Sequence, residues 1–277
     1  MLLTVAQVIG GLIAGSLSLV ADALHNFSDA ISLIIAFVAR KVARRPTDEV
    51  MTFGYVRIEV VAALINYTAL IMIGLYLIYE AVIRFADPPA VSGWIVVVIA
   101  GIALVVDLVT AALTYSMSKH SVNIRAAFLH NVADALGSVG VIVAGVLIML
   151  FDWRLVDPIV TLAIAGYILW QSFAEIGPVI RILLLGSPPD VSTGAVIDSM
   201  TKVDGVVDVH HAHFWQMDEH ASAVDAHVVI AEGEWSRADA IKQDLKRMLK
   251  QRYDISHSTL ELECSHHACS NVQTIGH

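Results

Sequence analysis

Long runs of apolar residues recur along the first two thirds of this 277-residue chain. Most of them approach the length of about 20 residues that an α-helix needs to cross a bilayer. A soluble core does not produce repeated runs of that length, and 57% of the residues are apolar while only 16% are charged. The sequence therefore predicts an α-helical membrane protein whose helices are surrounded by lipid.

Six transmembrane helices are expected in residues 1–185, and the first of them is short for a full span. The first run lacks a charged n-region and leads straight into the second, so no cleavable signal peptide is expected. The predicted spans are Leu2–Gly15, Leu17–Ala39, Ile58–Phe85, Gly93–Met117, Ile124–Phe151 and Val156–Leu185.

Basic residues are concentrated in the loops after the second and fourth spans, and the opposite loops contain few. Because Lys and Arg gather in short cytoplasmic loops, both termini should be cytoplasmic. A bacterial inner membrane is the default location, and an organelle membrane with the same orientation is the alternative. The basic residues in or next to these loops include Arg40, Lys41, Arg44, Arg45, Lys119 and Arg125.

The composition changes at "GSPPD" (186–190), where two prolines end the last span. Residues 186–277 read as a helix, two alternating strands, an amphipathic helix capped by Ser236, and a third strand. This order is typical of a two-layer α+β domain with its helices on one face of a small sheet. We therefore expect a cytoplasmic α+β domain after the membrane helices.

Two nearly identical words, "LHNFSDA" and "LHNVADA", lie inside the second and fifth spans. The first supplies His25 and Asp29, and the second supplies His130 and Asp134. In each pair the residues are four apart, so a helix presents them on one face. Two such helices facing each other give two nitrogen and two oxygen ligands, a set that suits zinc.

The charge of this site explains why carboxylates are tolerated in a membrane. Two carboxylates and one divalent cation sum to zero, whereas two bare carboxylates cost several kcal/mol each, on the order of the effective penalty for a buried ion. Without metal the histidines take up protons near neutral pH. A site that holds either metal or protons predicts an antiporter. The alternative is that these polar groups only join helices by hydrogen bonds.

Neighbouring polar residues have less defined roles. For Asp22 a structural role near a helix start is favoured over an entry-path carboxylate. Asn26 and Asn131 each follow a histidine and are expected to orient the ligands. Asp107 either joins a proton path or hydrogen-bonds inside a hydrated cavity.

These motifs resemble the cation diffusion facilitator family of divalent-metal/proton antiporters. The matching words include "GSLSLVADALHNFSDA", "FGYVRIEVVAALIN" and "NIRAAFLHNVADALGSVGV", with "HFW" and "ISHSTLELE" further along the chain. The resemblance implies six helices, a cytoplasmic metallochaperone-like (ferredoxin-like) domain, a homodimer and zinc as the main substrate. His25, Asp29, His130 and Asp134 match the family's transport ligands. Asp107 stands where the family pattern leads us to expect Asn.

The C-terminal region is rich in metal ligands, and surface histidines are the alternative interpretation. Strand alternation places His211 and His213 on one face and His210 on the other. By resemblance, a regulatory zinc site is expected from His213, His227 and Glu263, with His210 and His257 as further candidates. The terminal "CSHHAC", with Cys264 and Cys269, is a second compact cluster of soft ligands.

Other functions fit less well. The same fold could carry cadmium, cobalt, iron or manganese, and a membrane-bound metal sensor is a different class. A sensor does not need paired ionisable motifs in two spans. A metalloenzyme needs an open metal position, which four protein ligands do not leave. No catalytic residue and no organic cofactor are expected. No nucleic-acid partner is expected either, since no basic tract suggests a polyanion.

Overall fold

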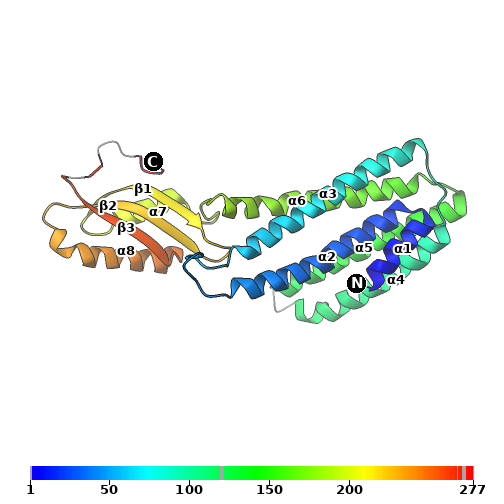
Figure 1. Cartoon of the computed structure of the whole chain (residues 1–277), viewed down its shortest axis with the longest axis horizontal. Coiled ribbons are helices and arrows are strands. Elements are labelled where there is room, and N and C mark those ends of the chain that lie inside the picture. Colours follow the sequence, from blue (N-terminus) through cyan, green and yellow to red (C-terminus); the bar gives the residue numbers. More distant parts are fainter. Residues whose placement is uncertain (1, 119–121, 267, 270–272, 277) are drawn as a thin grey trace. The chain divides into compact units, whose positions relative to one another are not determined.

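The computed structural model describes residues 2–118, 122–266, 268–269 and 273–276 (Figure 1). It divides into two compact units, which are described separately. The helical unit consists of Met1–Ala39 and Ala62–Ile176, and the α+β unit consists of Arg40–Val61 and Gly177–His277.

The first six helices in the described part of the chain are α1 (Leu2–Ala14), α2 (Leu17–Ala43), α3 (Ile58–Ala86), α4 (Gly93–Ser118), α5 (Val122–Phe151) and α6 (Val156–Leu183). Among the described residues, five of these helices, α2 to α6, are long and apolar enough to cross a membrane. At 1.5 Å per residue, the 13 residues of α1 span about 20 Å, less than the roughly 30 Å of a bilayer core. The structure therefore supports five of the six predicted spans by length.

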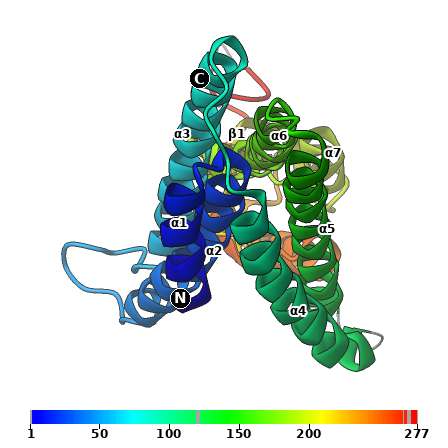
Figure 2. The same ribbon diagram turned by 90° about the vertical axis from the view of Figure 1, so that its right-hand side faces the viewer.

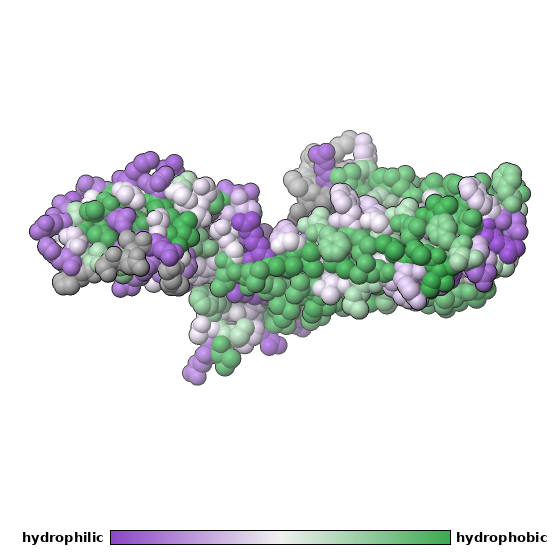
Figure 3. Space-filling model, turned by 90° about the horizontal axis from the view of Figure 1, so that it is seen from above, coloured by the Kyte–Doolittle hydropathy of each residue, from purple (hydrophilic) through white to green (hydrophobic). Residues whose placement is uncertain are grey.

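The outward surface of the helical unit is largely apolar, and Figure 3 shows hydrophobic side chains over most of the face in view. Leu33, Phe37, Leu113 and Trp170 are each at least 70% exposed. Large exposed apolar residues on every long helix are costly in water and suit contact with lipid tails. Together with the length of the helices, this surface identifies an integral membrane protein.

Helices α4 and α5 pack closely, and α1 lies against α4 (Figure 2). A Cβ added to Gly93 would lie 2.5 Å from the carbonyl oxygen of Gly145, and one added to Gly145 would lie 3.0 Å from that of Gly93. The two backbones thus meet at a point where a side chain has no room. Small residues allow this approach between membrane helices.

The start of α2 is held by a buried carboxylate from α6. Asp157 accepts hydrogen bonds from the hydroxyls of Ser16 (2.6 Å) and Ser18 (2.7 Å), and from the amides of Leu17 (2.8 Å) and Ser18 (3.2 Å). Arg84 of α3 donates to the Gly15 carbonyl at 2.7 Å and lies 3.9 Å from Asp157. The carboxylate satisfies the free amides that begin a helix.

In the α+β unit, α7 (Thr193–Thr201), β1 (Val206–Gln216), β2 (Ser222–Ile230), α8 (Ala238–Tyr253) and β3 (His257–Cys264) follow in the predicted order. The sheet order is β1-β2-β3, with β1–β2 antiparallel and β2–β3 parallel. Apolar residues of α7 and α8 pack on one face of it. The α+β prediction is confirmed. A short 3₁₀ helix, Trp235–Arg237, precedes α8, so the N-cap of α8 is Arg237 rather than the predicted Ser236.

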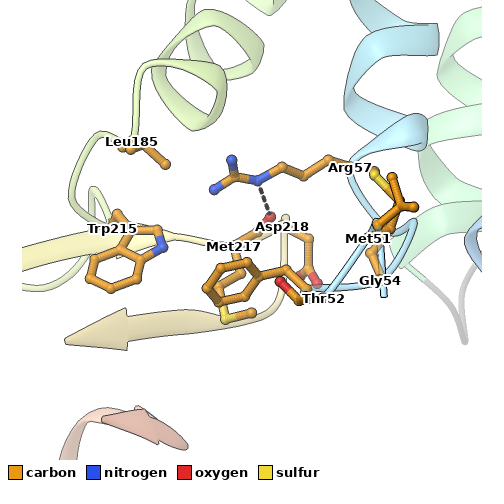
Figure 4. A pocket seen from close by; sticks show the side chains of 11 residues that line it. Met51, Thr52, Gly54, Arg57, Leu185, Trp215, Met217 and Asp218 are labelled. Atoms are coloured by element: carbon orange, nitrogen blue, oxygen red, sulfur yellow. Dashed lines mark hydrogen bonds between the residues drawn. The ribbon is translucent and has the colours of Figure 1, made fainter. Parts of the chain in front are cut away.

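The loop between α2 and α3 belongs to the α+β unit and meets the β1–β2 turn there. Arg57 donates from Nε to the Met217 carbonyl at 3.1 Å and from Nη2 to the Gln216 carbonyl at 3.4 Å. Beside this contact lies a cavity of about 430 Å³, lined by Trp215 and Leu185 among others (Figure 4). Its lining is mostly apolar, and Arg57 ties the loop to the sheet.

Candidate functional site

The two His–Asp pairs meet inside the helical unit. On α2, His25 and Asp29 are one turn apart, and on α5 the same is true of His130 and Asp134. The Nε2 atom of His25 lies 3.4 Å from Asp134 Oδ1 and 3.7 Å from Asp29 Oδ2. The Nε2 atom of His130 lies 3.1 Å from Asp29 Oδ2 and 3.4 Å from Asp134 Oδ2. Each imidazole therefore faces a carboxylate from both helices.

These distances suit one tetrahedral zinc ion. Bonds of about 2.0 Å place neighbouring ligand atoms about 3.3 Å apart in a tetrahedron, close to the observed separations of 3.1–3.7 Å. One atom from each of the four residues lies within 4.8 Å of all the others. Among the described residues, neither ring nitrogen of His25 has a hydrogen-bond partner. A buried nitrogen that makes no hydrogen bond but faces two carboxylates is expected where a cation binds.

The four ligands differ in exposure. His25 and Asp134 are buried, with 9% and 8% of their side chains exposed, whereas Asp29 and His130 are 31% and 34% exposed. All four line a cavity of about 620 Å³, which Asn66 and other residues of α3 and α6 also line. Two of the four side chains are thus accessible from the cavity surface, and the other two are almost fully buried.

Polar residues around the ligands form a second layer. Asn66 of α3 accepts hydrogen bonds from the hydroxyls of Ser32 and, at 3.5 Å, Ser28. Asp107 of α4 accepts one from Ser138 at 3.1 Å and lines the same cavity. Asn66 was not singled out from the sequence, because nothing in α3 repeats the His–Asp pattern.

Asp22 lies inside α2, one turn before His25, rather than at the helix start. It is 4% exposed and accepts a hydrogen bond from Gln7 Nε2 of α1 at 2.8 Å. The carboxylate at the helix start is instead Asp157, which sequence reasoning missed because it is distant in the chain. Asn26 and Asn131 line the cavity beside the ligands.

A second group of ligands lies on the sheet of the α+β unit. Ligand atoms of His210, His211, His227 and Cys269 lie within 4.8 Å of one another. His227 also groups with Glu261 and Glu263, and its Nδ1 lies 2.6 Å from Glu263 Oε1.

A β-bulge explains why His210 and His211 lie together. The register of β1 against β2 shifts between His210 and His213, and His211 has a φ of 47°. The rings of His210 and His211 lie 5.3 Å apart, and both are close to His227. The prediction of strict alternation, which placed His210 and His211 on opposite faces, is therefore wrong, since a bulge adds a residue to one strand.

The other ligands that the sequence predicts in the C-terminal region lie outside these clusters. His213 is opposite Asp225 in the backbone register of β1 and β2, and Cys264 is opposite Ile230 in that of β3 and β2. The ring centroid of His257 lies 5.9 Å from that of Phe53. Glu261 was missed, although alternation in "LELE" places it on the same face as Glu263. His267 lies outside the described residues.

The charges around His210, His227, Glu263 and Cys269 favour a bound cation. Burial raises the pKa of Glu263, but hydrogen bonds from His227 and Cys269 outweigh that effect and hold the pKa below its ordinary value. Burial and the adjacent Glu263 carboxylate raise the pKa of the Cys269 thiol. His210 is 2% exposed, with Nδ1 3.2 Å from Asp208 and Nε2 3.2 Å from Glu263. Carboxylates of this kind orient imidazoles that bind metals.

Comparison with known proteins identifies the family. Residues 1–184 match the family model described as the cation efflux transmembrane domain, and residues 188–264 match the cation efflux protein cytoplasmic domain. The "Cadmium, cobalt and zinc/H(+)-K(+) antiporter" of Bacillus subtilis is 35% identical and covers 97% of this chain and 87% of that protein. The "Zinc transporter ZitB" of Pectobacterium atrosepticum is 35% identical and covers 99% and 86%.

A solved structure, the "Metal-bound C-terminal domain of the CzcD transporter" from Cupriavidus metallidurans, is 26% identical and covers 26% of this chain and 99% of that one. Its TM-score of 0.25 is too low to indicate a shared fold. The two matched family models and the similarity over most of each relative's length show the family instead. The chain belongs to the cation efflux family of membrane transporters, the cation diffusion facilitators that its motifs resemble.

Proposed function

We propose that this protein is an antiporter that exports Zn²⁺ from the cytoplasm in exchange for protons. One observation carries the proposal: four ligand atoms from two membrane helices lie within 4.8 Å of one another, from His25, Asp29, His130 and Asp134. A relative named as a zinc transporter and another named as a cadmium, cobalt and zinc antiporter support it.

Exchange follows from the charge of the site. With zinc bound, two carboxylates neutralise the ion, and the imidazoles must be neutral to act as ligands. When zinc leaves, the carboxylates remain uncompensated in the membrane, and His25 and His130 can take up protons in its place. Zinc and protons therefore compete for the same atoms. If the site faces each side of the membrane in turn, this competition couples their movements.

Cadmium and cobalt are alternative cargoes, because the printed name of the Bacillus subtilis relative includes both. Two imidazoles and two carboxylates form a borderline ligand set that also accepts other first-row divalent ions. Zinc fits the short ligand separations best, since it prefers four ligands in a tetrahedron.

The proposal extends to the membrane topology, the C-terminal domain and the oligomeric state. We place residues 1–185 in the membrane as six helices, with the bilayer thinned around the short α1. Residues 186–277 then form a cytoplasmic, metal-binding and dimerising domain of ferredoxin-like type, in which zinc also acts as a regulatory ion. Both termini are cytoplasmic, the membrane is a bacterial inner membrane, and the working unit is a homodimer.

The test is zinc flux into proteoliposomes containing the purified full-length protein, recorded together with a pH-sensitive dye. Asp134→Asn keeps the shape of the side chain but removes the charge that neutralises zinc, so flux should fall to background. Asp152→Asn makes the same chemical change at an exposed carboxylate outside the site and should leave flux intact. Normal flux in Asp134→Asn would refute the site, and zinc movement without opposing proton movement would refute antiport.

A further inference from the structure

Strand β1 lies at an edge of the three-stranded sheet, and the C-terminal tail covers part of that edge. The bulge leaves the amides of His211 and Ala212 outside the pairing with β2. They donate instead to the carbonyls of Gln273 (3.0 Å) and Thr274 (3.2 Å), and Ala212 forms a parallel bridge with Ile275. The tail therefore adds a very short strand where the edge of the sheet would otherwise be open.

The same tail is attached to the face of the sheet four residues earlier, at Cys269. Its amide donates to Glu263 Oε2 at 3.4 Å, and its Sγ lies 3.5 Å from Glu263 Oε1 and 4.0 Å from His227 Nδ1. The thiol thus points into the group of three imidazoles. One side chain of the tail meets ligands that belong to both β1 and β2.

Two backbone hydrogen bonds do not hold a tail in place by themselves. The net contribution of each is smaller than the conformational entropy lost when the residues around it become ordered. The edge contact therefore needs a second attachment that is stronger. Three imidazoles and one thiolate form a closed tetrahedral set of the kind that binds structural zinc.

We propose that a soft divalent cation bound by His210, His211, His227 and Cys269 latches the C-terminal tail onto the edge of β1. Cys269 gives up its thiol proton to solvent and bonds to the ion through sulfur. The ion then joins the tail to both strands, and the two edge hydrogen bonds form as a consequence. When the ion leaves, the tail is released and the edge amides of β1 become available for pairing with another chain. The latch deepens the regulatory metal binding of the proposed function and does not depend on transport.

Cobalt alone is the first probe, added to the purified full-length protein. A thiolate bound to Co²⁺ gives a near-ultraviolet charge-transfer band, and the transport site contains no thiol. The band should be present in the wild type and in Cys264→Ser, and absent in Cys269→Ser. Persistence of the band in Cys269→Ser, or its loss in Cys264→Ser, would overturn the assignment. The result is the same whether or not zinc is transported.

Hydrogen exchange of the β1 amides tests the latch itself. Zinc should slow exchange at His211 and Ala212 on the order of tenfold in the wild type, because it converts a fraying contact into a held one. Cys269→Ser should lose this protection. A chain ending after Cys269 keeps every ligand but lacks the edge strand, so it should keep the cobalt band and lose the protection. Equal zinc protection in either variant would overturn the proposal.

Discussion

Asp157 of α6, which caps the start of α2, allows a stability prediction with a worked magnitude. Asp157→Asn replaces one of the two acceptor oxygens by an NH₂ group. One oxygen receives the Leu17 amide and the other receives the donors of Ser16 and Ser18. Whichever way the amide points, at least one buried donor then faces another donor. Such an unsatisfied group costs about 1–3 kcal/mol.

The remaining hydrogen bonds also weaken, because bonds to an ionised acceptor are roughly twice as strong as neutral ones. Arg84 is not orphaned, since it keeps its bonds to the Gly15 carbonyl and to Glu80. We therefore expect Asp157→Asn to reduce the free energy of unfolding by about 2–4 kcal/mol. For a chain of this size, that corresponds to a drop in Tm on the order of 10 °C.

The assay is thermal unfolding of the purified protein in detergent, followed by tryptophan fluorescence. The matched control is Asp152→Asn, the same change at a carboxylate that is 73% exposed and pairs only with Arg154 among the described residues. Its effect should stay within about 0.5 kcal/mol. Equal melting temperatures for the two variants would show that the Asp157 network does not stabilise the start of α2.

Three further predictions concern other parts of the chain. His25→Asp replaces a nitrogen ligand by an oxygen and adds a charge, so the preference for zinc over cadmium in competitive flux should fall by roughly tenfold, about 1.4 kcal/mol; an unchanged ratio would assign selectivity to another feature. Gly93→Ala should destabilise the protein by about 1–3 kcal/mol, because the added carbon meets the backbone of Gly145. Gly101→Ala is the neutral control in the same melting assay, because in the described structure a Cβ there meets nothing within 4 Å beyond the neighbouring backbone of its own helix. Hydrogen bonds from Tyr55 and from two backbone amides hold the pKa of Asp48 below its ordinary value. This carboxylate therefore stabilises the α2–α3 loop above its unfolded pKa, and that stabilisation is lost as the pH falls through its folded pKa. Loop amides should exchange more slowly in the wild type than in Asp48→Asn at neutral pH, and the difference should vanish in acid; a difference that persists in acid would contradict this role.

The features that could be predicted from the sequence follow from the spacing of residues that are close together in the chain. His25 with Asp29, and His130 with Asp134, follow from the helical repeat, which fixes which residues share a face. The order of helices and strands after residue 186 follows from changes in hydrophobic period and from prolines. Both signals depend only on neighbours in the chain, so a single sequence contains them.

Long-range partners and backbone irregularities could not be read in this way. The bond between Gln7 and Asp22, and the cap that Asp157 provides for α2, join residues far apart in the chain. The bulge at His211 depends on a local change in pairing between β1 and β2 that no residue pattern marks. It brings His211 to His210 and so changes which ligands can share an ion.

The unequal exposure of the four proposed transport ligands has a consequence for how an ion loses its water. A hydrated cation in the cavity first meets Asp29 and His130, which are partly exposed, and there exchanges part of its hydration shell. His25 and Asp134 lie deeper and can only replace the last water molecules. Dehydration is thus divided into two steps, and an ion that keeps its water tightly, such as Mg²⁺, stops after the first. A large excess of Mg²⁺ should therefore leave zinc flux almost unchanged, whereas strong inhibition would mean that Mg²⁺ reaches the inner pair.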